Sequence, residues 1–259
     1  MYKRQGDAQA FVRTAALNFD VETFFNKWLS DLKADQNENG CVGHYIPELN
    51  KESSPSAAWS DAACICPWEI YLAYGNKQIL ENQFSSMCKW VDFIGCTTQA
   101  PFLWTGCSHY GDWLGLDAPV GSCKGSSRQD FIASAFYAYS TSLVIKAGKA
   151  LGKDVKAYEQ LYHNILQTFR RTFTEYTTQT ECVLAAYFGL AEDPQKAVVQ
   201  LVSLIEQAGG KLQTCLLYTS NFLRLAHNKE MMPVPAPNST ARPPFPPRIK
   251  AESKRASVP

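Results

Sequence analysis

No stretch of this chain approaches the run of about 18 apolar residues that a membrane-spanning helix needs. Segments that alternate apolar and polar residues, as half-buried strands do, are also missing at any real length. Only 19% of the 259 residues are charged and 46% are hydrophobic, which fits a globular protein with a sizeable core. We therefore expect no membrane span and a body built from helices.

The chain also lacks an excess of either charge, because its formal net charge is only +1. Residues 221–259 hold seven Lys or Arg and two acidic residues, so residues 1–220 hold 18 basic and 22 acidic side chains. A mildly acidic body argues against nucleic acid as a partner. The basic tail is of the kind that is more often solvated than bound to a polyanion.

The nine cysteines are odd in number, and their spacing does not resemble a disulfide framework. Cys64 and Cys66 are too close together for a usual zinc pair, and no second Cys/His pair follows at a suitable distance. We expect small buried hydrophobic cysteines in a reducing compartment, which slightly favours the cytoplasm. No loop is rich enough in Asp to predict calcium, so the sequence indicates no metal and no cofactor.

Apolar residues recur at steps of three and four, and this periodicity predicts seven helices. Their expected ranges are 8–33, 61–75, 77–94, 128–151, 155–174, 179–189 and 194–208. Asp7 is expected to cap the first, and Gly75 to end the second. Short and long connections alternate, which is typical of helical hairpins arranged in a ring, with long loops at one end carrying function. Residues 231–259 contain eight of the 14 prolines and are expected to be disordered.

Two indole–carboxylate pairs point to a sugar site: Trp59 with Asp61, and Asp112 with Trp113. The axial C–H groups of a sugar pack on an aromatic face, and its hydroxyls donate to fixed carboxylate oxygens. Each pair lies at an expected junction between a loop and a helix. The alternative is that both tryptophans are ordinary core residues and that Asp7 and Asp61 only cap helices. His109, in the same long loop, is expected to have no role.

The order and spacing of several motifs resemble the catalytic domain of bacterial α-L-rhamnosidases. These motifs are Gly6-Asp7-Ala8-Gln9-Ala10-Phe11, Arg13-Thr14-Ala15-Ala16, Phe25-Asn26-Lys27-Trp28-Leu29, Asp35-Gln36 with Asn39-Gly40, Ala58-Trp59-Ser60-Asp61-Ala62, Gly111-Asp112-Trp113-Leu114, Asp130-Phe131-Ile132-Ala133 and Phe136-Tyr137-Ala138-Tyr139-Ser140-Thr141. The resemblance covers residues 6–214. It implies an (α/α)6 toroid, here incomplete, which removes terminal α-L-rhamnose from glycosides with inversion.

The resemblance also implies which residues bind the sugar. Asp7 matches the aspartate of the Gly-Asp-Ala-Gln motif, and Trp59 and Trp113 match aromatic walls of the pocket. Asp61 and Asp112 lie beside those walls and are expected to accept sugar hydroxyls. An inverting enzyme needs an acid and a base about 6.5–9.5 Å apart. The family's acid lies just before the Gly-Asp-Ala-Gln motif and its base lies downstream, so neither falls on a matching position here.

We therefore assign no catalytic residue and expect the chain alone to be inactive. Two other functions stay open: a six-hairpin glycosidase that acts on another sugar, and a non-catalytic sugar-binding module.

The two ends of the resemblance share an unusual property. Residues 2–5 can be encoded by TAT AAG AGA CAG, and residues 215–220 by TGT CTC TTA TAC ACA TCT. These strings are reverse complements over their shared length and are similar to a transposon end used in sequencing libraries. We therefore expect a non-native leader at 1–5, a partial catalytic domain at 6–214, and a non-native, disordered tail at 215–259.

Overall fold

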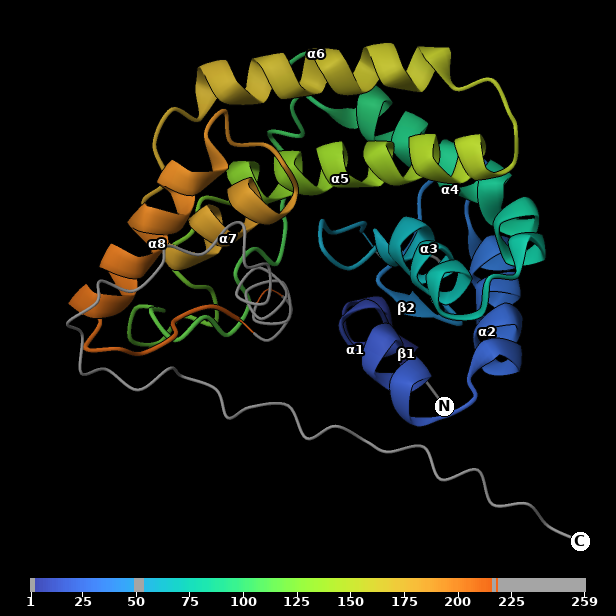
Figure 1. The fold of residues 1–259 in the computed structure, drawn as a ribbon, viewed down its shortest axis with the longest axis horizontal. Helices are drawn as coiled ribbons and strands as arrows, with labels where there is room; N and C mark the ends of the chain where they lie inside the picture. Colours follow the sequence, from blue (N-terminus) through green and yellow to red (C-terminus); the bar gives the residue numbers. More distant parts are fainter. Residues whose placement is uncertain (1–2, 49–53, 216–217, 219–259) are drawn as a thin grey trace, which may run out of the picture.

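The protein is almost entirely helical (Figure 1). The computed structural model describes residues 3–48, 54–215 and 218. Its elements are β1 (Lys3–Arg4), α1 (Gln5–Asn18), α2 (Glu22–Asp35), β2 (Tyr45–Ile46), α3 (Ala62–Tyr74), α4 (Lys77–Thr97), α5 (Gln129–Ala150), α6 (Lys156–Thr172), α7 (Gln179–Tyr187) and α8 (Pro194–Gln207). The short strands β1 and β2 pair antiparallel, with Lys3 opposite Ile46. The prediction of an all-α fold is confirmed.

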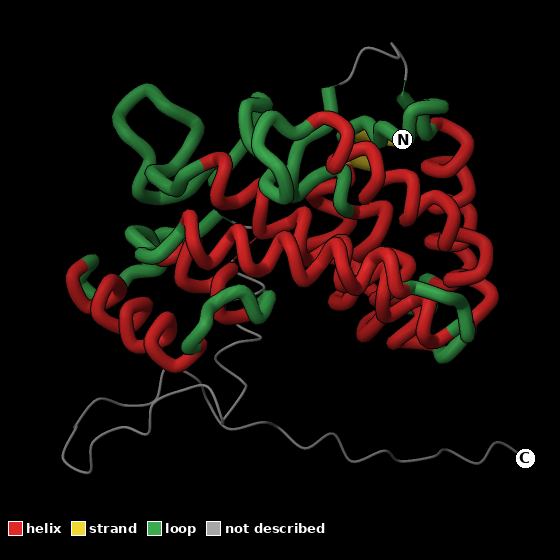
Figure 2. Tube along the Cα trace, turned by 90° about the horizontal axis from the view of Figure 1, so that it is seen from above, coloured by secondary structure: helices red, strands yellow, loops and turns green. Residues whose placement is uncertain are grey.

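The helices form two layers along an arc (Figure 1). In the first layer α1 contacts α3, α3 contacts α5, and α5 contacts α7. The second layer covers the first, because α2 and α4 pack on α3, α6 packs on α5, and α8 packs on α7. Figure 2 shows that the longest loops gather at one end of these helices. The paired layers agree with the expected partial toroid of hairpins.

Burial differs between the layers as the sequence pattern requires. Helix α5 is buried around most of its circumference, from Phe131 to Gly148. Helix α6 buries only Ile165 and Phe169 and leaves its polar face in water. A helix that is apolar on most sides needs neighbours on most sides, whereas an amphipathic helix needs one. The composition of α5 and of α6 therefore agrees with the layer in which each lies.

The expected helix at 8–33 is wrong, because the chain breaks into α1 and α2 at residues 19–21. The Tyr74 hydroxyl accepts a hydrogen bond from Val21 N at 2.9 Å and donates one to Phe19 O at 3.3 Å. These backbone groups therefore find their partner on α3 instead of within a continuous helix. Asp7 is also not an N-cap, since α1 begins at Gln5 and Asp7 lies exposed in its first turn.

The other expected helices are found with small changes at their ends. Helix α3 follows Asp61 and stops at Gly75, which has a φ of +73° and donates its N–H to Tyr71 O at 2.8 Å. No disulfide joins the nine cysteines, five of which are buried. Within the described ranges, no helix has the length and apolarity to cross a membrane, and no His, Cys, Asp or Glu cluster suits a metal ion. The expected disorder of residues 231–259 lies outside the described residues.

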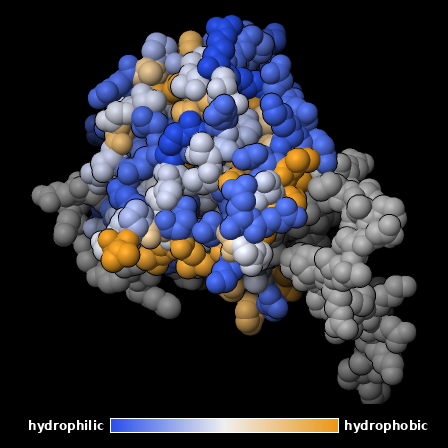
Figure 3. All heavy atoms as spheres, turned by 90° about the vertical axis from the view of Figure 1, so that its left-hand side faces the viewer, coloured by the Kyte–Doolittle hydropathy of each residue, from blue (hydrophilic) through white to orange (hydrophobic). Residues whose placement is uncertain are grey.

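Large apolar side chains are exposed at both ends of the arc. At the α1 end, Leu17 is 80% exposed and Phe19 67% exposed. At the other end, Leu116 is 76% exposed and Val199, on α8, is 54% exposed. Figure 3 views this second end and shows several groups of apolar side chains at the surface. Exposed apolar side chains at both ends of the arc are expected where a ring of helices is incomplete.

Tyr74→Phe should lower the free energy of unfolding by about 1 kcal/mol, because two backbone groups at the α1–α2 break lose their partner. Urea denaturation would measure the change. Tyr71→Phe, which removes a hydroxyl one turn earlier in α3, is the control and should have a smaller effect. Equal effects of the two substitutions would show that the Tyr74 hydroxyl does not hold the break.

Candidate functional site

Trp59 lies in a tight turn that leads into α3. Ala58 adopts a positive φ of 66°, and its N–H donates to Asp61 Oδ2 at 2.8 Å. Gln9 Nε2 of α1 donates to Ala58 O. Gly6 also packs on the indole, since a Cβ at this position would lie 2.7 Å from Trp59 Nε1. The Gly-Asp-Ala-Gln segment and the Trp59 turn, about 50 residues apart, therefore form one packed unit.

Trp113 stands on the long loop between α4 and α5. This loop is closed by a bridge between Trp113 and Lys124 and by a hydrogen bond from Leu114 N to Cys123 O at 2.6 Å. The Trp113 ring contacts Tyr110 at a centroid distance of 5.3 Å, and Tyr110 contacts Trp59 at 4.7 Å. Trp113 and Tyr110 are partly exposed, and Trp59 is 8% exposed. We call Trp59, Tyr110 and Trp113 the aromatic wall.

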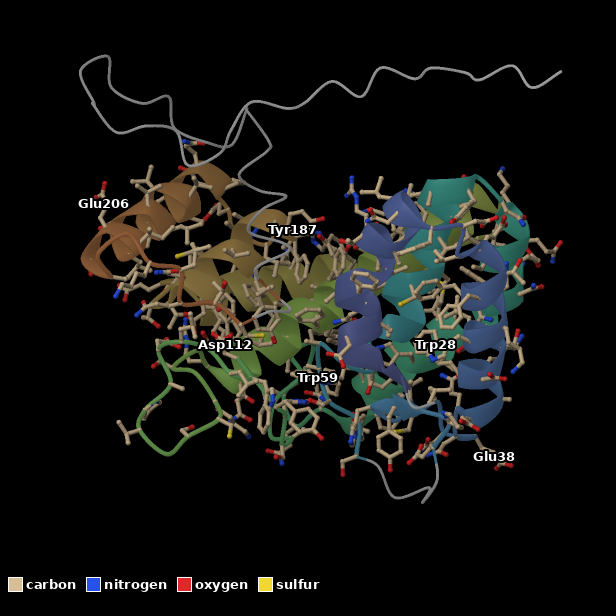
Figure 4. The ribbon with its side chains drawn as sticks, turned by 90° about the horizontal axis from the view of Figure 1, so that it is seen from below. Trp28, Glu38, Trp59, Asp112, Tyr187 and Glu206 are labelled. Atoms are coloured by element: carbon tan, nitrogen blue, oxygen red, sulfur yellow. The ribbon has the colours of Figure 1, made fainter. Side chains whose placement is uncertain are left out.

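Two hydrogen bonds fix the loops that form this wall. Tyr110 N donates to Ser56 Oγ at 3.0 Å, and Ala57 N donates to His109 Nδ1 at 3.2 Å. Figure 4, in which Trp59 and Asp112 are labelled, shows the two loops next to each other at the loop-bearing end of the helices. The structure thus brings together the two tryptophans that the sequence singled out, with Tyr110 in contact with both.

Asp112 is turned into the protein and is only 1% exposed. Its Oδ2 accepts from Ser127 Oγ at 2.8 Å, and its Oδ1 accepts from Cys215 N at 3.2 Å. Its carbonyl oxygen accepts from Gly115 N and Gly125 N at 3.0 and 2.8 Å. Burial raises the pKa of Asp112. In this structure the side chain holds the long loop together and does not face the open side of the aromatic wall.

Asp61 is fully buried at the point where three helices meet. Its Oδ1 accepts from Trp90 Nε1 on α4 at 3.0 Å and from Ser140 Oγ on α5 at 2.6 Å. Its Oδ2 accepts from Ala58 N. Burial raises its pKa, and these hydrogen bonds oppose the rise. The structure therefore places neither Asp61 nor Asp112 at the surface where a sugar hydroxyl would reach it. Of the expected carboxylates, only Asp7 is exposed.

His109 is not the idle loop residue that the sequence suggested. It is 3% exposed, packs edge-on against Trp104 at 4.5 Å, and accepts the Ala57 N–H through Nδ1. Its carbonyl oxygen accepts from Lys124 Nζ at 2.7 Å. Burial, with a smaller contribution from the Lys124 ammonium, lowers the pKa of His109 from 6.5 to about 4. A neutral imidazole therefore joins the two loops of the wall.

An ion pair between the exposed Arg128 and the buried Glu181 joins the starts of α5 and α7. Arg128 Nε and Nη2 donate to Glu181 Oε1 and Oε2, both at 2.8 Å, and Arg128 N also donates to Oε1 at 3.0 Å. Burial alone would raise the pKa of Glu181, but the guanidinium and the backbone N–H groups of Thr177 and Arg128 lower it overall. Arg128 and Glu181 lie 53 residues apart, so nothing in the sequence paired them. Tyr110, by contrast, directly precedes the Gly-Asp-Trp motif and could have been noticed there.

Comparisons with known proteins define the family. The family model for the bacterial alpha-L-rhamnosidase 6 hairpin glycosidase domain matches residues 4–232. The chain belongs to this family. The matched range continues past Thr214, so the boundary of the non-native tail stays a prediction.

Individual relatives agree. The chain is 32% identical to an alpha-L-rhamnosidase from Formosa agariphila and 33% identical to one from Alteromonas sp., in each case over 83% of this chain. A crystal structure of the Streptomyces avermitilis alpha-L-rhamnosidase complexed with L-rhamnose superposes with a TM-score of 0.74 and 28% identity, over 86% of this chain and 23% of that one. The chain spans about a quarter of the length of the curated relatives, 24% and 25%.

The low pKa of His109 predicts a pH-dependent stability. Since the folded pKa is about 4 and the unfolded pKa about 6.5, the unfolded chain binds more protons between these values, and stability falls as the pH drops through that window. His109→Asn keeps an acceptor for Ala57 N but does not titrate. Between pH 7 and pH 4.5 the wild type should lose on the order of 2 kcal/mol more than this variant.

Urea denaturation at several pH values would measure this difference, with His163→Asn, at an exposed position on α6, as the control. Parallel curves for wild type and His109→Asn would show that the imidazole does not resist protonation in the folded protein.

Asp61→Ala should lower the free energy of unfolding by about 3 kcal/mol or more, because three buried donors lose their acceptor. Ser140→Ala removes only one of these bonds and should cost about 1 kcal/mol. Chemical denaturation of both variants and of the double variant would give the coupling between the two residues. Additive effects would contradict the proposed junction.

Proposed function

We propose that this chain is part of the catalytic domain of an inverting α-L-rhamnosidase and that the aromatic wall binds the terminal rhamnose. The observation that carries this proposal is the contact of Trp59 and Trp113 with the same Tyr110 ring, at 4.7 and 5.3 Å. The two tryptophans lie 54 residues apart in the sequence, and the resemblance of their motifs had implied a sugar-binding role for both. Such a wall offers the axial C–H groups of a deoxyhexose a continuous aromatic surface.

The carboxylates divide into two roles in this proposal. Asp7 is exposed in the first turn of α1, one residue after Gly6, which packs on Trp59. It is therefore the aspartate we propose as a direct acceptor of sugar hydroxyls. Asp61 and Asp112 act through the turns that they hold, since both side chains are buried and accept hydrogen bonds from within the protein. They position Trp59 and Trp113.

Hydrolysis with inversion needs a general acid and a general base on opposite faces of the sugar. Near the wall, Asp61 and Asp112 are 0% and 1% exposed, so we assign neither role to them. We propose that both groups come from parts of the family's enzymes that this chain does not span. A non-catalytic sugar-binding module is the second candidate function. Such a module would bind sugar through the same aromatic wall and would not need Asp61 or Asp112 to be exposed for catalysis.

The sugar site is tested by titrating the protein with methyl α-L-rhamnopyranoside while following the indole N–H signals by NMR. Trp113→Ala should weaken binding about tenfold, because the sugar loses one aromatic face. Trp68→Ala is the matched control, since Trp68 is a partly exposed indole on α3 that packs against Tyr71, outside the wall. Equal binding by wild type and Trp113→Ala would refute the proposed site.

The chain alone should release no 4-nitrophenol from the corresponding α-L-rhamnoside, because the residues that the structure describes place no acid–base pair at the wall. It should also aggregate readily, since Leu17, Phe19 and Leu116 are among the large apolar side chains in water. Turnover that Trp113→Ala abolishes would show that the catalytic pair lies within these 259 residues. If the chain binds rhamnose but does not turn over the rhamnoside, the result agrees with the proposal.

A further inference from the structure

Tyr110 occupies the middle of the aromatic wall, yet the motifs of the sequence do not include it. Its ring touches Trp59 at a tilt of 52° and Trp113 at 69°. Its backbone N–H donates to Ser56 Oγ, so the main chain that carries the ring is held by the neighbouring loop. A ring that is partly exposed and contacts both proposed sugar-binding indoles belongs to the same surface.

The hydroxyl of Tyr110 is also oriented. It lies 3.1 Å from His44 Nε2, and His44 Nδ1 lies 3.1 Å from Ser54 O. A carbonyl oxygen only accepts, so Nδ1 carries the ring proton, and in the neutral imidazole Nε2 must accept. Tyr110 O–H therefore donates to His44, and this leaves lone pairs on the phenol oxygen directed away from the imidazole.

An oxygen whose own proton is already committed can only accept a further hydrogen bond. Sugar hydroxyls are donors, and they surround the ring that packs on an aromatic face. His44 adds no competing donor, since its second nitrogen is bonded to Ser54 O. The ring of Tyr110 thus supplies a packing surface, and its oxygen supplies one directional acceptor on that surface.

We propose that Tyr110 is a third sugar-contacting residue of the wall and that its oxygen, oriented by His44, accepts a hydrogen bond from one hydroxyl of the bound rhamnose. His44 is a positioning residue, because it acts through Tyr110. The inference rests on the proposed function and adds a specificity determinant to it: the wall discriminates between sugars by the position of one hydroxyl as well as by shape.

The test uses the full chain, methyl α-L-rhamnopyranoside and its 2-, 3- and 4-deoxy analogues, with binding followed by NMR. Tyr110→Phe keeps the ring and should weaken binding of the parent sugar about three- to tenfold. For the wild type, one deoxy analogue should bind more weakly than the parent sugar, by the same factor. For Tyr110→Phe, that analogue and the parent sugar should bind equally well. Tyr71→Phe, which removes a hydroxyl outside the wall, should bind all four sugars as the wild type does.

His44→Ala supplies the test of positioning. It should weaken binding by less than Tyr110→Phe does, and the double variant should bind like Tyr110→Phe alone, because His44 acts only through the phenol oxygen. Thermal unfolding of each variant separates a binding defect from a folding defect.

Two results would overturn the inference. Unchanged binding by Tyr110→Phe, or equal discrimination among the deoxy sugars by wild type and variant, refutes the role of the hydroxyl and leaves the proposed function standing. A folded wild-type chain that binds none of the four sugars refutes the proposed sugar site, and this inference with it.

Discussion

The rest of the structure depends on the hydrogen bonds that the buried carboxylate of Asp61 accepts. One buried side chain accepts from the turn that carries Trp59, from Trp90 on α4 and from Ser140 on α5. A charged or polar group without partners is costly to bury, so the arrangement is favourable only when all three donors are in place. The packing of three helices and the position of the first indole of the wall are therefore set together.

The same principle recurs in the loop between α4 and α5. Asp112 and His109 are polar residues that the loop buries, and each is satisfied by groups that are distant in the sequence. A loop of this length would otherwise be mobile. Its internal hydrogen bonds give Tyr110 and Trp113 a fixed platform, which the proposed sugar site would require.

Much of this could be predicted from the sequence, because helix periodicity and stop residues such as Gly75 are local signals. The family motifs also singled out two tryptophans, Trp59 and Trp113, that contact the same Tyr110 ring. The break at residues 19–21 could not be predicted, since Val21 continues the apolar pattern from Leu17 to Phe24. The group that stabilises the break, Tyr74, is 53 residues from Val21. For the same reason Asp61 and Asp112 read as exposed ligands: residue type is visible in a sequence, but the direction of a side chain is set by tertiary contacts.

The contact between Gly6 and Trp59 has an implication for how this family can vary. Gly6 has no need of glycine for its backbone conformation, because it lies in an ordinary helical turn. It is small because the indole occupies the volume that a methyl group would fill. A larger side chain at this position would displace a ring about 50 residues away, so the size of one residue in α1 controls where the indole before α3 lies.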